Sequence, residues 1–273
     1  MVGAEPSSEG DASERRRLAA AAVAQHCRAA IEAAGPACVA VKPQLACFER
    51  LGADGWRALE QTVAAAHEHG LLVLADGKRG DVPVTARAYA QALVGETPTP
   101  WGAVGGLGAD AFTANPLLGR DSLEPLLEAA DAAAAGCFLL VRTSNPGAAD
   151  VQDLDTGGGA VHESLALMVA ELGAGRTGEC GLASVGAVTG ATRPELLERL
   201  RELMPHAIFL LPGVGAQGGA VEDLAAAFRP HPAAGLIAAS RSIVHAAGEG
   251  EDPAQAAAAA AEELRAAAWA LAC

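Results

Sequence analysis

Short apolar runs alternate with alanine-rich stretches of helical periodicity along most of this 273-residue chain. The runs at 38–41, 71–75, 111–114, 137–141, 184–188, 207–211 and 235–239 are predicted to be strands. Helices are expected near residues 13–34, 55–69, 83–94, 121–135, 160–173, 194–203, 219–228 and 253–271. Strands that alternate with helices at this interval predict βαβ units and a parallel sheet.

One more strand would close such a sheet into a barrel, and residues 1–6 are the place left for it. About half of the residues are apolar, which is enough for one large core in a chain of this length. We therefore predict an α/β fold, a single (β/α)8 TIM barrel domain over residues 1–273. Residues 1–12 are expected to hold a truncated, flexible first strand.

The formal net charge of −14 argues against a nucleic-acid partner, because such partners need a basic patch. The start of the chain lacks the apolar core of a secretory signal, and no apolar run approaches the ~20 residues that span a bilayer. The six cysteines form no CxxC pair and share no ligand-like spacing with the seven histidines. These features predict a reduced, cytoplasmic enzyme without a bound metal or membrane contact.

Lysine is nearly absent: Lys42 and Lys78 stand against 17 arginines. Arginine stays protonated at any accessible pH, whereas a lysine ammonium is a compact charge that can give up its proton. Lys78 lies in Asp76-Gly77-Lys78-Arg79-Gly80-Asp81, directly after the apolar run 71–75. The sequence therefore predicts proton chemistry by an ammonium and two carboxylates at the end of a buried strand.

Other polar residues also follow predicted strands, where the active sites of parallel barrels lie. The residues in such positions are Lys42, Asp76, Lys78, Asp81, Asn115, Arg142, Ser144, Gln217 and Arg241. Residues 213–218 also match G-x-G-x-x-G. However, they follow the run 207–211, which is the seventh strand of the barrel when residues 1–6 are counted as the first, and the next strand does not end in the acidic residue of a dinucleotide site. This position favours phosphate binding through backbone N–H groups.

Short motifs occur in a fixed order between residues 38 and 245. They are Val41-Lys42-Pro43-Gln44 with Phe48-Glu49, Asp76-Gly77-Lys78-Arg79-Gly80-Asp81 with Thr85, Asn115-Pro116 with Gly119, Arg142-Thr143-Ser144-Asn145-Pro146-Gly147, Gly190-Ala191-Thr192, Pro212-Gly213-Val214-Gly215-Ala216-Gln217-Gly218-Gly219, and Ser240-Arg241. In this combination the chain resembles the orotidine 5'-phosphate decarboxylases, in particular their longer bacterial type 2 branch. The Asp-x-Lys-x-x-Asp element alone is shared with related phosphosugar enzymes.

The resemblance implies decarboxylation of orotidine 5'-phosphate to UMP in pyrimidine nucleotide biosynthesis, without metal or organic cofactor. Loss of CO2 from C6 leaves a carbanion that the pyrimidine ring does not delocalise, so the site must stabilise it. The family's motif assigns protonation of C6 to Lys78 and places Asp81 near the departing carboxylate. It also implies that Asp76 holds Lys78, and that Lys42 binds the ribose while pairing with Asp76.

The resemblance also implies the substrate contacts. Asp81 and Thr85 would reach the neighbouring subunit's site, so a homodimer is expected, and Ser144 would bind the pyrimidine amide. Gln217, Gly218 and Arg241 would bind the phosphate, with Arg241 offering a bidentate contact. Arg79 and Arg142 are expected to have structural roles.

Three departures from the family's pattern stand out. Glu5 occupies the place of a ribose-binding Asp after the first strand, and it lies unusually close to Met1. Pro83 lies within Val82-Pro83-Val84, and Gly77 stands where Ala is common. Alternatives therefore stay open: a divergent paralogue acting on a modified nucleotide in secondary metabolism or analogue resistance, a Mg-dependent sugar-phosphate enzyme of the same superfamily, or a catalytically silent nucleotide-binding protein.

Overall fold

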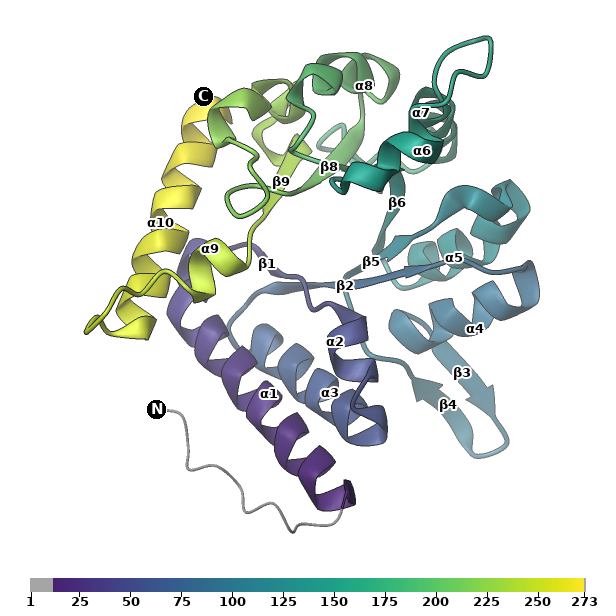
Figure 1. Cartoon of the computed structure of the whole chain (residues 1–273). Coiled ribbons are helices and arrows are strands. Elements are labelled where there is room, and N and C mark those ends of the chain that lie inside the picture. The colour runs from purple at the N-terminus through teal and green to yellow at the C-terminus, as the bar shows by residue number, and fades with distance from the viewer. Residues whose placement is uncertain (1–11, 273) are drawn as a thin grey trace.

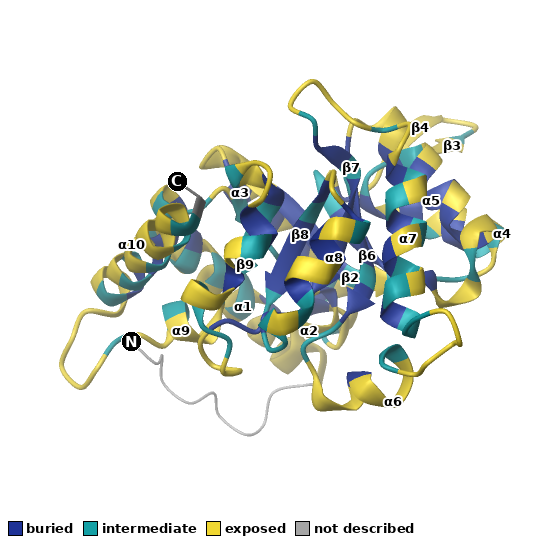
Figure 2. Cartoon of the chain, turned by 90° about the horizontal axis from the view of Figure 1, so that it is seen from above, coloured by how far each residue is buried: buried dark blue, intermediate teal, exposed yellow. Residues whose placement is uncertain are grey.

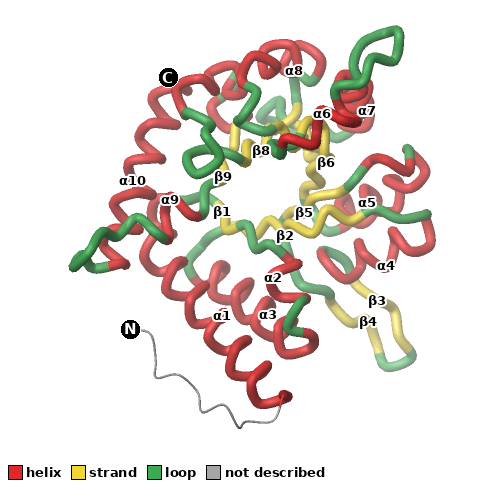
Figure 3. Tube along the Cα trace, in the orientation of Figure 1, coloured by secondary structure: helices red, strands yellow, loops and turns green. Residues whose placement is uncertain are grey.

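The computed structural model describes residues 12–272, which form a curled parallel sheet surrounded by helices (Figures 1 and 3). In spatial order the strands are β1 (Ala40–Val41), β2 (Leu72–Arg79), β5 (Ala111–Ala114), β6 (Gly136–Arg142), β7 (Ala183–Thr189), β8 (Ala207–Pro212) and β9 (Gly235–Ala238). Every neighbouring pair is parallel. Chain order equals spatial order, as expected when each crossover carries a helix.

The central strands are buried on both faces, as Figure 2 shows for β2, β6 and β8. In β6, Phe138 joins a small cluster inside the curl with Leu74, Val188 and Leu210. Its neighbour Leu139 belongs to the larger core between the strands and the helices. Burial on both faces explains why these strands read as continuous apolar runs rather than as alternating ones.

The helices form the outer layer (Figure 3). They are α1 (Ala12–Ala34), α2 (Leu45–Glu49), α3 (Gly52–Glu68), α4 (Pro83–Leu93), α5 (Arg120–Ala132), α6 (Ala149–Gln152), α7 (Val161–Gly173), α8 (Leu197–Leu203), α9 (Arg241–Val244) and α10 (Pro253–Ala272). Helix α1 packs against both α3 and α10. The helical layer is therefore continuous from the helix that precedes β1 to the one that follows β9.

All seven strands predicted within the described residues are confirmed, with one informative difference. Strand β2 does not end at residue 75 but continues to Arg79, so Asp76 and Lys78 lie within the strand. The stretch at 219–228 is also not an α-helix: it forms a 3-10 helix over Val221–Phe228, after a loop that ends at Gly219. The predicted strand at 1–6, and Glu5 with it, lie outside the described residues.

A short antiparallel hairpin interrupts the βα order between α4 and β5. It consists of β3 (Glu96–Thr99) and β4 (Gly102–Gly105), and it extends away from the sheet (Figure 1). The sequence did not lead us to expect it, because its glycines and prolines read as a loop. Within residues 12–272, no helix is both long and apolar enough to cross a membrane. The predicted cytoplasmic location stays a prediction.

Candidate active site

The Asp-x-Lys segment lies on a bulge in β2. Ala75 pairs with Phe112 of β5 and Arg79 pairs with Ala114, so residues 76–78 stand opposite Thr113 alone. Within this bulge, Lys78 adopts the left-handed backbone conformation, with φ of 48°. Such a conformation is costly for a residue with a side chain and is typical of functional sites. The bulge turns Lys78 and Asp76 toward the same point at the C-terminal end of the sheet.

Asp76 is the centre of this group. Its Oδ2 accepts a hydrogen bond from Lys42 Nζ at 2.7 Å, and its Oδ1 accepts one from Lys78 Nζ at 2.6 Å. The Asp76 side chain is buried, whereas those of Lys42 and Lys78 keep 26% and 41% of their surface exposed. Both lysines of the chain thus meet one carboxylate and leave a net positive charge facing the open side of the site.

The pKa of Asp76 lies below its usual value. Burial alone would raise this pKa, but the charges and hydrogen bonds of Lys42 and Lys78 outweigh the loss of solvation. Asp76 is therefore a carboxylate at neutral pH. It can hold both ammonium groups in fixed positions.

Two polar partners of Asp76 were missed by the sequence analysis. Thr113 Oγ1 donates to Asp76 Oδ1 at 2.8 Å and accepts from the Lys78 backbone N–H at 2.9 Å. The side-chain amide nitrogen of Gln44 donates to Asp76 Oδ2 at 3.1 Å. The available signal was Thr113 itself, a hydroxyl in the otherwise apolar run 111–114 that ends beside the motif.

Asp81 follows β2 at the start of α4. Its Oδ1 accepts a hydrogen bond from the next residue's backbone N–H at 2.7 Å. Pro83 is the first residue of α4, where its missing N–H costs nothing. Thr85 lies one turn into the same helix and is partly exposed. Neither Asp81 nor Thr85 joins the hydrogen bonds around Asp76 within this chain, across residues 12–272.

The absence of a side chain at Gly77 has a local packing reason. A Cβ added at Gly77 would lie 2.6 Å from Cδ1 of Leu45, which is fully buried. Leu45 would have to move to admit a methyl group.

Arg79 has the structural role expected from the sequence. Its guanidinium pairs with Glu49 and lies 5.2 Å from the centre of the Tyr89 ring. It thereby links β2 to α2 and α4.

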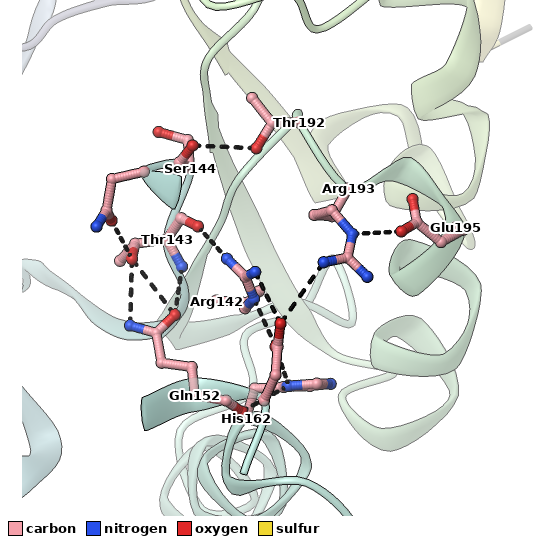
Figure 4. Close-up of polar contacts among 10 residues, drawn as sticks. Arg142, Thr143, Ser144, Gln152, His162, Thr192, Arg193 and Glu195 are labelled. Atoms are coloured by element: carbon pink, nitrogen blue, oxygen red, sulfur yellow. Dashed lines mark hydrogen bonds and ion pairs between the residues drawn. The ribbon is translucent and has the colours of Figure 1, made fainter. Parts of the chain in front are cut away.

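Ser144 lies on a loop after β6, and contacts of the neighbouring Arg142 and Thr143 hold this loop in place (Figure 4). Arg142 is buried and donates to Asp153 through Nε at 2.8 Å and Nη2 at 3.0 Å. Gln152 Oε1 accepts from the Thr143 backbone N–H at 2.8 Å. The structure therefore gives Arg142 the anchoring role predicted for it and adds Gln152 and Asp153, which follow Ser144 within ten residues.

The opposite side of the site is formed by the loop after β8 and by the start of α9. Gln217 Oε1 accepts a hydrogen bond from Ser144 Oγ at 2.9 Å. The Gly218 N–H donates to Gly215 O at 2.8 Å, so the loop is partly closed on itself. Arg241 is exposed at the start of α9, and no ion pair found among residues 12–272 includes it.

No group of three or more histidine, cysteine or acidic side chains with the geometry of a metal site occurs in the described part of the chain. The positions of the polar groups instead suit an anionic organic molecule. One end of the site offers two ammonium groups, and the other offers a free guanidinium beside a glycine-rich loop.

Comparisons with known proteins show which family the chain resembles. Residues 17–260 match the family model described as Orotidine 5'-phosphate decarboxylase / HUMPS family. The orotidine 5'-phosphate decarboxylase of Rhodopirellula baltica is 44% identical over 244 residues, 88% of this chain and 79% of that protein. That of Deinococcus radiodurans is 47% identical over 219 residues, 80% and 75% of the two chains.

The structure of Leishmania donovani OMP decarboxylase superposes with a TM-score of 0.73 at 34% identity, over 92% of this chain and 89% of that one. This likeness confirms the predicted barrel class. The family model covers most of the chain, and the two relatives are 44% and 47% identical to it over 79% and 75% of their own lengths. The chain therefore belongs to the orotidine 5'-phosphate decarboxylase / HUMPS family.

Proposed function

We propose that this protein is a carbon–carbon lyase that decarboxylates orotidine 5'-phosphate to UMP in pyrimidine nucleotide biosynthesis. The observation that carries the proposal is the Lys42–Asp76–Lys78 group, in which both lysines of the chain bind one buried carboxylate. The relatives named above bear the same activity in their names.

The reaction breaks the bond between C6 and the carboxylate carbon. CO2 leaves, the electron pair stays on C6, and a proton must then be delivered to that carbon. We assign the delivery to the Lys78 ammonium, because it is the more exposed of the two lysines and a buried carboxylate fixes it in place. No redox step or electron-sink cofactor is needed to balance this reaction.

Binding of the rest of the nucleotide is assigned to the groups around the mouth of the site. Arg241 lacks an ion-pair partner among the described residues and would bind the phosphate together with Gln217 and the Gly218 loop. Ser144, which already donates to Gln217, would contact the pyrimidine amide. Lys42 would contact the ribose, and Glu5 is proposed to do so from the segment outside the described residues.

A homodimer with shared sites is part of the proposal. Val82 and Val84, the residues between Asp81 and Thr85 on either side of Pro83, are exposed, and so are Leu117 and Leu118, which follow the neighbouring strand β5. Val84 alone is 85% exposed. Burial of this patch against a second copy would remove the apolar surface from water and bring Asp81 and Thr85 to the partner's site.

The shared site can be tested by mixing Lys78→Ala with Asp81→Ala protein. In a mixed dimer, one site lacks both residues and the other has both intact. Random exchange should therefore restore about a quarter of wild-type activity, because half of the dimers are mixed. Activity no higher than that of the separate variants would contradict sharing.

A single domain over residues 1–273 is also proposed. The described ends of the sheet, β1 and β9, are each only partly buried. A strand from residues 1–6 between them would cover these edges and complete the eight-stranded barrel.

The activity is tested by the loss of ultraviolet absorbance when orotidine 5'-phosphate is added to purified protein. We expect rapid loss in the presence of a chelator and none with Lys78→Ala. Activity that is lost in chelator would favour the alternative of a Mg-dependent sugar-phosphate enzyme. UMP binding without turnover by wild-type protein would indicate a binding protein.

A further inference from the structure

Thr113 connects β5 to the bulge of β2 through its side chain. Residues 76–78 stand opposite Thr113 alone, so the regular ladder of backbone hydrogen bonds is interrupted there. A backbone N–H that loses its partner in the ladder needs another acceptor. The Thr113 hydroxyl supplies it to Lys78, at 2.9 Å.

The same hydroxyl has a second bond. It donates to Asp76 Oδ1 at 2.8 Å, and this oxygen also accepts from Lys78 Nζ at 2.6 Å. One hydroxyl can donate once and accept at the same time, so both bonds coexist. Thr113 thereby fixes the backbone of Lys78 and also the carboxylate that holds its ammonium.

The conformation of Lys78 makes this support necessary. A left-handed backbone costs of order 1–3 kcal/mol in a residue with a side chain and persists only where the surroundings enforce it. Thr113 is suited to enforce it, because its side chain is 1% exposed and its branched Cβ restricts χ1.

We propose that Thr113 is a positioning residue for the Lys78 ammonium, an inference that rests on the proposed function of Lys78 as the proton donor. Thr113 acts through Asp76 and the Lys78 backbone. Its loss should affect the chemical step more than nucleotide binding, because the proposed phosphate contacts come from the other end of the site.

The kinetic test compares Thr113→Val, Thr113→Ser and Thr189→Val. Thr113→Val keeps the shape but removes both bonds, and kcat should fall by about ten- to a hundredfold with KM within about threefold. Thr113→Ser keeps the hydroxyl and should recover kcat to within about fivefold of wild type. Thr189 is the matched control: it is a buried strand threonine whose hydroxyl has no hydrogen-bond partner among the described residues, so Thr189→Val should leave both constants unchanged.

Three kinetic results would overturn the positioning role of Thr113. A kcat of Thr113→Val close to wild type, or a loss that Thr113→Ser does not recover, would overturn the proposal. A fall in kcat of the same size in Thr189→Val would also overturn it, because the loss would then follow from replacing any buried threonine and not from the two hydrogen bonds of Thr113. If Thr113→Val fails to fold, Thr113→Ala removes the same two hydrogen bonds with a smaller side chain, and the same fall in kcat is expected.

A second measurement does not depend on activity. Protein labelled with 15N-lysine has backbone amide signals from Lys42 and Lys78 alone, and Lys78→Ala identifies the Lys78 signal by its absence. Thr113→Val should shift this signal and speed its hydrogen exchange by about tenfold or more, while the Lys42 signal stays in place. An unchanged Lys78 signal would overturn the positioning role. If wild-type protein shows no decarboxylation, the proposed function fails while the amide test still reports on Thr113.

Discussion

The two ends of the site differ in how far their polar groups are already partnered. At the β2 end, the Asp76 carboxylate binds Lys42, Lys78 and Thr113 within the chain. At the other end, Arg241 is exposed without an ion-pair partner among the described residues, beside a glycine-rich loop. We infer that the proposed groups for chemistry are preorganised by contacts within the chain, whereas the proposed phosphate-binding groups would gain their main partner from the substrate.

The difference follows from the kinds of backbone that carry the groups. A bulged strand that pairs with a neighbour on each side has few alternative positions, and its buried side chains are fixed by packing. The loop of residues 213–219 includes Gly213, Gly215 and Gly218 at positive φ, and it bonds mainly to itself. Such a loop can adjust to a ligand. The comparison predicts that lesions at the two ends have separable effects.

Asp76→Asn should have the largest effect. It removes the charge that fixes both ammonium groups, so kcat should fall by at least about a hundredfold. The free energy of unfolding should also fall by about 2–3 kcal/mol, less than for a fully buried ion pair because the lysines stay partly exposed. Steady-state kinetics and denaturant unfolding measure the two effects. A variant with wild-type kcat would show that the fixed charges are not needed.

The same carboxylate predicts a pH dependence of stability. The pKa of Asp76 in the folded protein lies below its usual value of 3.8, so ionised Asp76 stabilises the fold above that value. This contribution is lost as the pH falls through the lower folded pKa. The difference in unfolding free energy between wild type and Asp76→Asn should thus be constant near neutral pH and shrink below 3.8. A difference in unfolding free energy that grows as the pH falls would mean that folding raises the pKa of Asp76, which would contradict the prediction.

Arg241→Ala should have a smaller effect, and of another kind. Loss of a charged contact to the phosphate should raise KM by about ten- to a hundredfold and leave kcat within about threefold. Arg265→Ala is the control, because Arg265 is an exposed arginine of α10 paired with Glu262. A fall in kcat without a rise in KM would place Arg241 among the groups for chemistry and remove the contrast between the ends.

Gln152→Ala should have the smallest effect. It removes the acceptor of the Thr143 N–H and loosens the loop that carries Ser144, so KM should rise by about three- to tenfold. Gln255→Ala, on the exposed surface of α10, serves as the control. An unchanged KM would mean that the ion pair of Arg142 and Asp153 holds the loop without Gln152.

The sequence alone predicted the strands and the groups at their ends, because apolar runs bounded by helical stretches leave little choice of fold. It did not predict the bulge in β2, which depends on the register with β5, a strand that is distant in sequence. Thr113 was missed for the same reason: a threonine in an apolar run is ordinary in a strand, and its contact to Asp76 follows from the bulge. The roles assigned to the site residues all stay predictions; these residues are Glu5, Lys42, Asp76, Lys78, Asp81, Thr85, Ser144, Gln217, Gly218 and Arg241.

One titration tests the separation of the two ends most directly: the affinity of Lys78→Ala for UMP, measured beside its single-turnover rate with orotidine 5'-phosphate. We expect no detectable decarboxylation and a dissociation constant for UMP within about threefold of wild type, because the substitution leaves the proposed phosphate-binding groups unchanged. Continued turnover, or loss of UMP binding together with turnover, would contradict it.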